Sequence, residues 1–119
     1  MSRAHRFRER VQKVAAGTSD DVDFGRITQP RHYVITHLAA RDVTTTPTGA
    51  LTIMVKGHGY DHLIDEVPAP AKGRLYVFSD EIMLEEGETL TARFDGATAD
   101  DALELFLEGV WREDDAGEG

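Results

Sequence analysis

The chain has 119 residues and a formal net charge of −9, with 40% hydrophobic and 29% charged residues. This length fits one domain with a modest core, and the composition excludes a chain that is disordered throughout. No apolar run approaches the ~20 residues of a membrane-spanning helix, and no signal-peptide core follows the basic N-terminus, so we expect a soluble protein. Cysteine is absent, which excludes disulfides, thiolate metal ligands and a cysteine nucleophile.

Charge is spread unevenly along the chain. Residues 1–16 hold five basic residues against one acidic residue, a net +4, which leaves −13 for the rest. Within this segment Phe7, Val11 and Val14 follow a helical spacing, which predicts a short helix. We expect residues 1–30 to form a basic, partly helical arm and linker, which either is a solvated, frayed terminus or docks on an acidic neighbour. The candidate interface residues of this arm are Arg3, Arg6, Phe7, Arg8, Arg10, Val11, Lys13 and Val14.

From residue 31 onward the hydrophobic period changes to two, which is typical of strands. Gly, Pro and Asp turns separate the apolar runs, and strands do not alternate with helices. The sequence therefore predicts an all-β domain over residues 31–113, a β-sandwich or jelly roll, followed by an acidic flexible tail at 114–119. The expected strands cover residues 33–38, 51–56, 60–67, 75–78, 82–84, 89–94 and 103–112.

The terminal strand is apolar on both faces. Leu103, Leu105 and Leu107 alternate with a second set of residues that includes Phe106 and Val110. Because alternate residues of a strand point to opposite faces, the leucines should line the core. The other face should be covered by the arm or by a neighbouring subunit, so Phe106 and Val110 are further interface candidates.

Four segments carry a resemblance to a known group of proteins. They are an early hydrophobic strand at 31–37, a Leu-x-Ile-x-Val strand at 51–55, an Ile-x-Leu hairpin with Gly-Glu-x-Leu at 82–90, and a Gly-Val ending at 108–113. This layout resembles small bacteriophage virion proteins of the capsid decoration, cement or head–tail accessory type. The resemblance implies a non-enzymatic virion protein, made in the host cytoplasm, that packs against other virion subunits and forms homo-oligomers.

The residues with most chemical character are His58, Asp61 and His62. On a helix the two histidines would share a face, but Gly57 and Gly59 disfavour a helix. On a strand they would lie ~13 Å apart, at ~3.3 Å per residue, too far to chelate one ion. A turn could still bring them together, so a cupin-like metal-binding enzyme remains the second alternative. No other catalytic motif is present, and we expect neither enzymatic activity nor a cofactor.

Three aromatic residues provide the first alternative, a carbohydrate-binding module. Trp111, Tyr60 and Tyr76 could form a sugar platform, although packing is the favoured interpretation for each of them. Nucleic acid is not expected as a partner, because the acidic body would repel phosphate and one short arm supplies few phosphate contacts.

Overall fold

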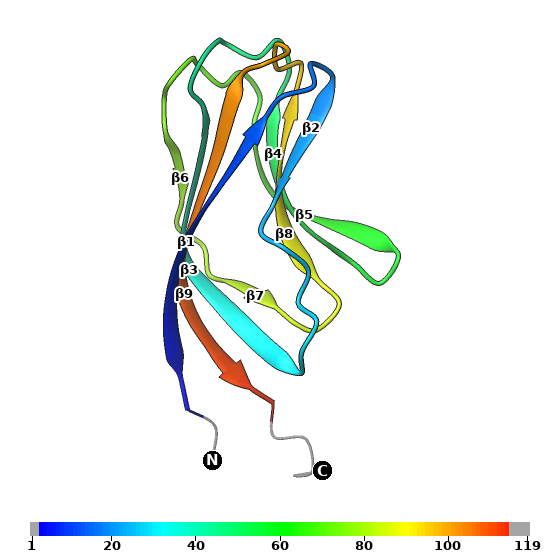
Figure 1. The fold of residues 1–119 in the computed structure, drawn as a ribbon, viewed down its shortest axis with the longest axis vertical. Coiled ribbons are helices and arrows are strands. Elements are labelled where there is room, and N and C mark those ends of the chain that lie inside the picture. The colour runs from blue at the N-terminus through cyan, green and yellow to red at the C-terminus, as the bar shows by residue number, and fades with distance from the viewer. Residues whose placement is uncertain (1–2, 115–119) are drawn as a thin grey trace.

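The structure of the protein, a computed structural model, describes residues 3–114. It contains two antiparallel sheets and, among the described residues, no helix (Figure 1). No segment within residues 3–114 is thus a helix long and apolar enough to cross a membrane. The strands are β1 (His5–Val14), β2 (Ser19–Asp23), β3 (Arg31–Asp42), β4 (Leu51–Gly57), β5 (Tyr60–Val67), β6 (Tyr76–Phe78), β7 (Ile82–Leu84), β8 (Thr89–Asp95) and β9 (Ala102–Glu113).

The two sheets differ in size. The larger sheet has the order β1-β9-β3-β6, and β7 pairs with another stretch of β3. The smaller sheet has the order β2-β8-β4-β5. The predicted all-β class is confirmed, and each strand expected from residue 31 onward is present. Of the tail predicted at 114–119, only residue 114 lies within the described residues.

The predicted helix in the N-terminal arm is wrong. Residues 5–14 form β1, which pairs with β9 from His5 opposite Trp111 to Val14 opposite Ala102. The apolar spacing misleads because i and i+4 share a face on a strand as well as on a helix. Phe7 and Val11 do lie together on the inner face against the core, whereas Val14 is 67% exposed.

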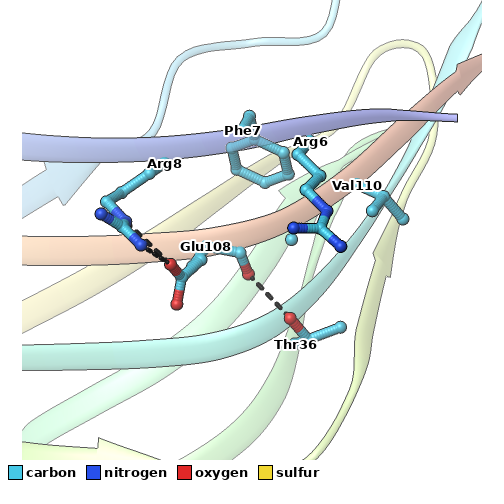
Figure 2. A pocket seen from close by; sticks show the side chains of 7 residues that line it. Arg6, Phe7, Arg8, Thr36, Glu108 and Val110 are labelled. Atoms are coloured by element: carbon cyan, nitrogen blue, oxygen red, sulfur yellow. Dashed lines mark hydrogen bonds and ion pairs between the residues drawn. The ribbon is translucent and has the colours of Figure 1, made fainter.

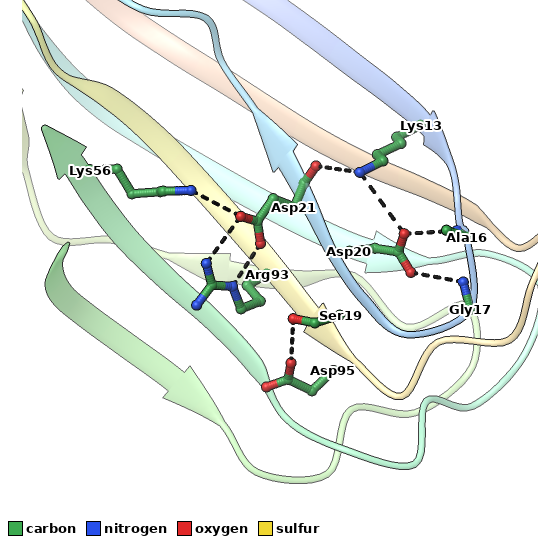
Figure 3. Close-up of polar contacts among 9 residues, drawn as sticks. All are labelled: Lys13, Ala16, Gly17, Ser19, Asp20, Asp21, Lys56, Arg93 and Asp95. Carbon is green, nitrogen blue, oxygen red and sulfur yellow. Dashed lines mark hydrogen bonds and ion pairs between the residues drawn. The ribbon is translucent and has the colours of Figure 1, made fainter. Parts of the chain in front are cut away.

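Part of the predicted linker is also a strand. Residues 19–23 form β2, at the edge of the smaller sheet beside β8. Its Asp20 is buried and accepts hydrogen bonds from the backbone N–H groups of Ala16 (2.7 Å) and Gly17 (3.2 Å), as Figure 3 shows. This carboxylate satisfies the turn between β1 and β2, and the neighbouring Val22 enters the core.

The core lies between the inner faces of the two sheets. Leu103, Leu105 and Leu107 are buried there, as predicted. A β-bulge at Thr36 shifts the register of β3, so that both Ile35 and Leu38 point inward despite their odd spacing. The other main core residues are Ala40, Leu51, Ile53, Val55, Leu90, Ala92 and Phe94.

The β4–β5 hairpin lies partly outside this core, because β4 contributes Leu51, Ile53 and Val55 to it, whereas β5 adds only the partly buried Ile64 and Val67. Its turn places His58 and Gly59 at positive φ angles of 55° and 87°, the conformation of a two-residue type I′ turn. β5 packs along β4, makes few contacts with other strands and is exposed along most of its length. In Figure 1 the hairpin diverges from the larger sheet. It therefore presents side chains that no other strand covers.

Candidate functional site

The outer face of the larger sheet is formed by alternate residues of β1, β9 and β3. The register sets them in rows across the three strands. On β9 and β3 apolar rows alternate with charged rows, while β1 contributes an arginine or a glutamine to each row. From one end the rows are Arg6, Val110 and Val34; then Arg8, Glu108 and His37; then Arg10, Phe106 and Ala39; and finally Gln12, Glu104 and Arg41.

A depression of about 470 Å³ lies where the bulge interrupts this face. Arg6, Arg8, Thr36 and Val110 line it, and the Thr36 hydroxyl donates to the Glu108 carbonyl at 3.3 Å (Figure 2). Bulges commonly re-aim side chains near functional sites. Here the bulge hollows a face that would otherwise be continuous.

A second depression of about 660 Å³ continues along the same face. It has an apolar floor that includes Phe106 and Leu75, and it shares Arg8 and Glu108 with the first depression. We call the two together the outer groove. Exposed Val77 and Met83 extend its apolar surface, since they lie beside Ala39 and Val34 in the sheet.

Phe106 is held between two arginines. The guanidinium carbons of Arg10 and Arg41 lie 6.0 and 5.9 Å from the centre of its ring, within the range of a cation–π interaction. Both arginines bind the carboxylate of Glu104, at 2.8 Å for Arg10 and 2.6 Å for Arg41, and Gln12 donates to it at 2.8 Å. The walls of the groove are therefore fixed by one shared carboxylate.

Glu104 is buried, with 4% of its surface exposed. Burial acts to raise the pKa of its carboxyl, but the hydrogen bonds from Arg41, Gln12 and Arg10 outweigh it and hold the pKa below its ordinary value. Glu104 contributes stability above the ordinary pKa of glutamate, and that stability is lost as the pH falls through the lowered value. The sequence contained no sign of this role, because its three partners lie on two distant strands.

Replacing Glu104 with glutamine should lower the free energy of unfolding by about 2 kcal/mol. The glutamine side chain cannot accept all three hydrogen bonds that Arg10, Arg41 and Gln12 donate to Glu104. Glu108→Gln is the matched control in the same strand. Its side chain is 40% exposed and pairs with an exposed Arg8, so the loss should be about 0.5 kcal/mol or less. Urea unfolding of the two variants measures the difference; equal losses would contradict the role of Glu104.

The basic residues of the predicted arm find acidic partners within the same chain. Arg8 pairs with Glu108 at 2.6 Å (Figure 2), and Lys13 lies 3.9 Å from Asp20 (Figure 3). Arg10 pairs with Glu104. β1 is thus anchored to the sandwich by charge as well as by its ladder. Arg6 has no ion-pair partner among residues 3–114 and stays available at the groove.

The structure brings some of the predicted interface residues together and separates others. Val11 packs on the core, Val14 lies beyond the groove, Lys13 contacts β2, and Arg3 is exposed ahead of β1. The residues that line the outer groove are Arg6, Phe7, Arg8, Arg10, Phe106 and Val110. Their function in binding stays a prediction.

The outer face of the smaller sheet is more polar. Asp21 of β2 accepts hydrogen bonds from Arg93 (2.7 Å) and Lys56 (3.0 Å), and Ser19 bonds Asp95 (Figure 3). The hydrogen bond from Arg93 is the largest cause of the lowered pKa of Asp21, and the bond from Lys56 lowers this pKa further. Burial acts in the opposite direction but is outweighed. These charges satisfy one another across β2, β8 and β4.

The three metal candidates lie on the β4–β5 hairpin, where His58 occupies the turn beside Gly87. Asp61 pairs with Lys56 on β4, and His62 pairs with Val55. Successive positions 61 and 62 point to opposite faces of the strand. Within residues 3–114 no group of three or more His, Cys, Asp and Glu side chains is placed to hold a metal ion.

The three aromatic candidates for a sugar platform lie on separate strands, β5, β6 and β9. Trp111 stacks on His5 at 4.2 Å, and the guanidinium carbon of Arg31 lies 3.8 Å from its ring centre. The hydroxyl of Tyr76 accepts the backbone N–H of Ala71 at 2.7 Å. Trp111 and Tyr76 therefore serve intramolecular packing, while Tyr60 is exposed alone on the hairpin.

No family model and no curated protein matches the chain. Among solved structures, a subunit of Bacillus endospore appendages, described as a novel family of disulfide-linked pili, is similar over 95% of this chain and 89% of its own, with 18% identity and a TM-score of 0.56. A chain from the structure of infectious bursal disease virus Gt strain is aligned over 93% of this chain, with 14% identity and a TM-score of 0.29; this chain spans 31% of its length. The first likeness shows a shared all-β fold.

Proposed function

We propose that this protein is a non-enzymatic structural subunit that joins an assembly through the outer groove. The observation that carries the proposal is the groove itself, an apolar strip with Phe106 at its centre and arginines at its border. Aromatic residues, methionine and arginine are the types enriched in protein interfaces. A monomer seldom leaves such a surface without a partner.

Two observations bear on the kind of assembly. The strand-and-turn resemblance favours a bacteriophage virion, in which the chain would be a decoration, cement or accessory subunit. The fold likeness to an appendage subunit favours a surface filament. That appendage is described as disulfide-linked, whereas this chain has no cysteine. Copies of this chain would therefore associate without disulfide bonds. In both cases the protein acts through packing between subunits.

The test is the concentration dependence of the molecular mass, measured by sedimentation velocity on the purified protein. The wild-type protein should self-associate, and Phe106→Ala should weaken association about 30-fold, because truncating a central aromatic anchor of an interface costs about 2 kcal/mol. Val14→Ala, on an exposed residue outside the groove, should associate like the wild type. A wild-type protein that stays monomeric at every concentration, alone and with candidate partners, would refute the proposal.

A further inference from the structure

Among residues 3–114 nothing occupies the outer groove, and the β4–β5 hairpin carries one strongly exposed apolar side chain, Leu63. We infer that these two surfaces bind each other between copies of the chain, so that the β5 side of one subunit lies in the outer groove of the next. This inference rests on the proposed function and adds the identity of the partner and of its contacting segment.

The hairpin presents one exposed leucine between two carboxylates. On β5, Asp61, Leu63 and Glu66 lie opposite Lys56, Met54 and Thr52 of β4, which places the three on the outer side of the smaller sheet. Leu63 is 67% exposed, one of the most exposed large hydrophobic residues in the described chain. These side chains are complementary to the groove, because Leu63 would pack on Phe106 and the two carboxylates would face the arginines.

The charges of the two surfaces are complementary. Residues 60–67 contain three acidic residues and no lysine or arginine, a net −3. Four arginines and two glutamates line the groove, and Glu104 beneath it leaves a net +1 in a chain whose total is −9. Each guanidinium has five N–H groups, so the arginines that already bind Glu104 and Glu108 keep donors for another carboxylate. Opposite charge would steer the two copies together.

The position of the surfaces requires two copies. The groove lies on the outer face of the larger sheet, whereas β5 is an edge strand of the smaller sheet on the far side of the core. The hairpin therefore cannot reach the groove of its own molecule. Because the contact joins two different surfaces, a pair of subunits keeps one groove and one hairpin free, and association continues into an open chain or closes into a ring.

The experiment uses two variants that each disable one surface. Leu63→Arg places a cation against the groove, and Phe106→Ala removes the floor of the groove; each alone should weaken association at least 30-fold. Mixed together, they should form a 1:1 heterodimer and nothing larger, because only one intact hairpin and one intact groove remain per pair. Sedimentation velocity measures the mass of the mixture.

Val14→Arg is the matched control, since Val14 is also 67% exposed but lies outside both surfaces; it should assemble like the wild type. If Phe106→Ala does not fold by circular dichroism, Arg8→Glu replaces it as the loss-of-association groove variant, on a side chain that is 83% exposed. Assembly of Leu63→Arg like the wild type, or a mixture that stays monomeric, would overturn the inference while the proposed function stands. A wild type that stays monomeric alone but binds a candidate partner would overturn the inference only, and one that stays monomeric in both conditions would overturn both.

Discussion

Replacing Gly109 with alanine should lower the free energy of unfolding by about 3 kcal/mol, a large fraction of the stability of a domain of this size. A Cβ at this position would lie 2.1 Å from the carbonyl oxygen of Val34 and 3.0 Å from the Cα of Ile35. Both are backbone atoms of β3 and cannot rotate away, so the β3–β9 ladder would have to separate at the bulge. Urea unfolding, with the midpoint and slope compared with the wild type, measures the loss.

Gly59→Ala is the control that separates the steric clash at Gly109 from the general effect of replacing a glycine with alanine. Gly59 has a positive φ of 87°, but no atom lies within 4 Å of the place that an alanine methyl group would occupy, so its substitution should cost about 1 kcal/mol of backbone strain. If Gly109→Ala unfolds at the same urea concentration as Gly59→Ala, the close approach of β9 to β3 is not a packing constraint. The groove would also change in the Gly109 variant, because Gly109 lines its first depression.

The strands from residue 31 onward could be predicted because each carries its own local signal. In β4, Leu51, Ile53 and Val55 alternate with Thr52, Met54 and Lys56, and Gly57 ends the run. In β9 the leucines at 103, 105 and 107 give the same period of two. In each of these strands, the alternation of apolar residues over a few positions is enough to identify the face that packs on the core.

β1 and β2 could not be predicted in the same way. β1 pairs with β9, about ninety residues away, and only Phe7 and Val11 of its inner face are clearly apolar. β2 has one core residue, Val22, among aspartates whose partners are Arg93 and the β1–β2 turn. Edge strands bury less surface than central strands, so the hydrophobic signal that identifies a strand is weakest where long-range pairing determines the structure.

The outer groove was predictable only in part. The two-sided pattern of β9 identified Phe106 and Val110 as candidates for an interface, and the basic N-terminus identified Arg6, Arg8 and Arg10. Their assembly on one face depends on the register of β1 against β9. The bulge at Thr36 and the buried Glu104, which shape the groove and hold its arginines, arise from packing between strands and leave no local pattern.

A buried pair of carboxyl groups closes the end of the sandwich where β3 ends and β9 begins. Asp42 and Asp101 are 2% and 1% exposed. Asp42 Oδ1 accepts the backbone N–H groups of Thr44 and Thr45, while its Oδ2 finds no N–H or O–H donor among the described residues. The Asp101 carboxylate accepts Thr45 Oγ1–H and the Thr98 N–H. The two side chains can therefore hydrogen bond to each other when one proton lies between them.

Stability should fall as the pH rises from about 4 to about 6 because of this pair. Burial, and then the hydrogen bond with Asp101, raise the pKa of Asp42 from 3.8 to about 6. A group with a raised pKa contributes stability that is complete below its unfolded value and is lost as the pH rises through the folded value. The full shift corresponds to at most about 3 kcal/mol. The pKa of Asp101 is lowered, since its hydrogen bonds with Asp42, Thr45 and Thr98 outweigh burial, so it stays ionised over this range.

Asp42→Asn tests this assignment, because the amide keeps the Oδ1 acceptor for Thr44 and Thr45 and supplies a permanent N–H donor to Asp101. The difference in unfolding free energy between the variant and the wild type, measured in urea at about pH 4 and about pH 7, should grow in favour of the variant at the higher pH. Asp80→Asn, on an exposed side chain, should leave the wild-type pH dependence in place. Parallel pH profiles for wild type and Asp42→Asn would mean that no proton is shared between Asp42 and Asp101.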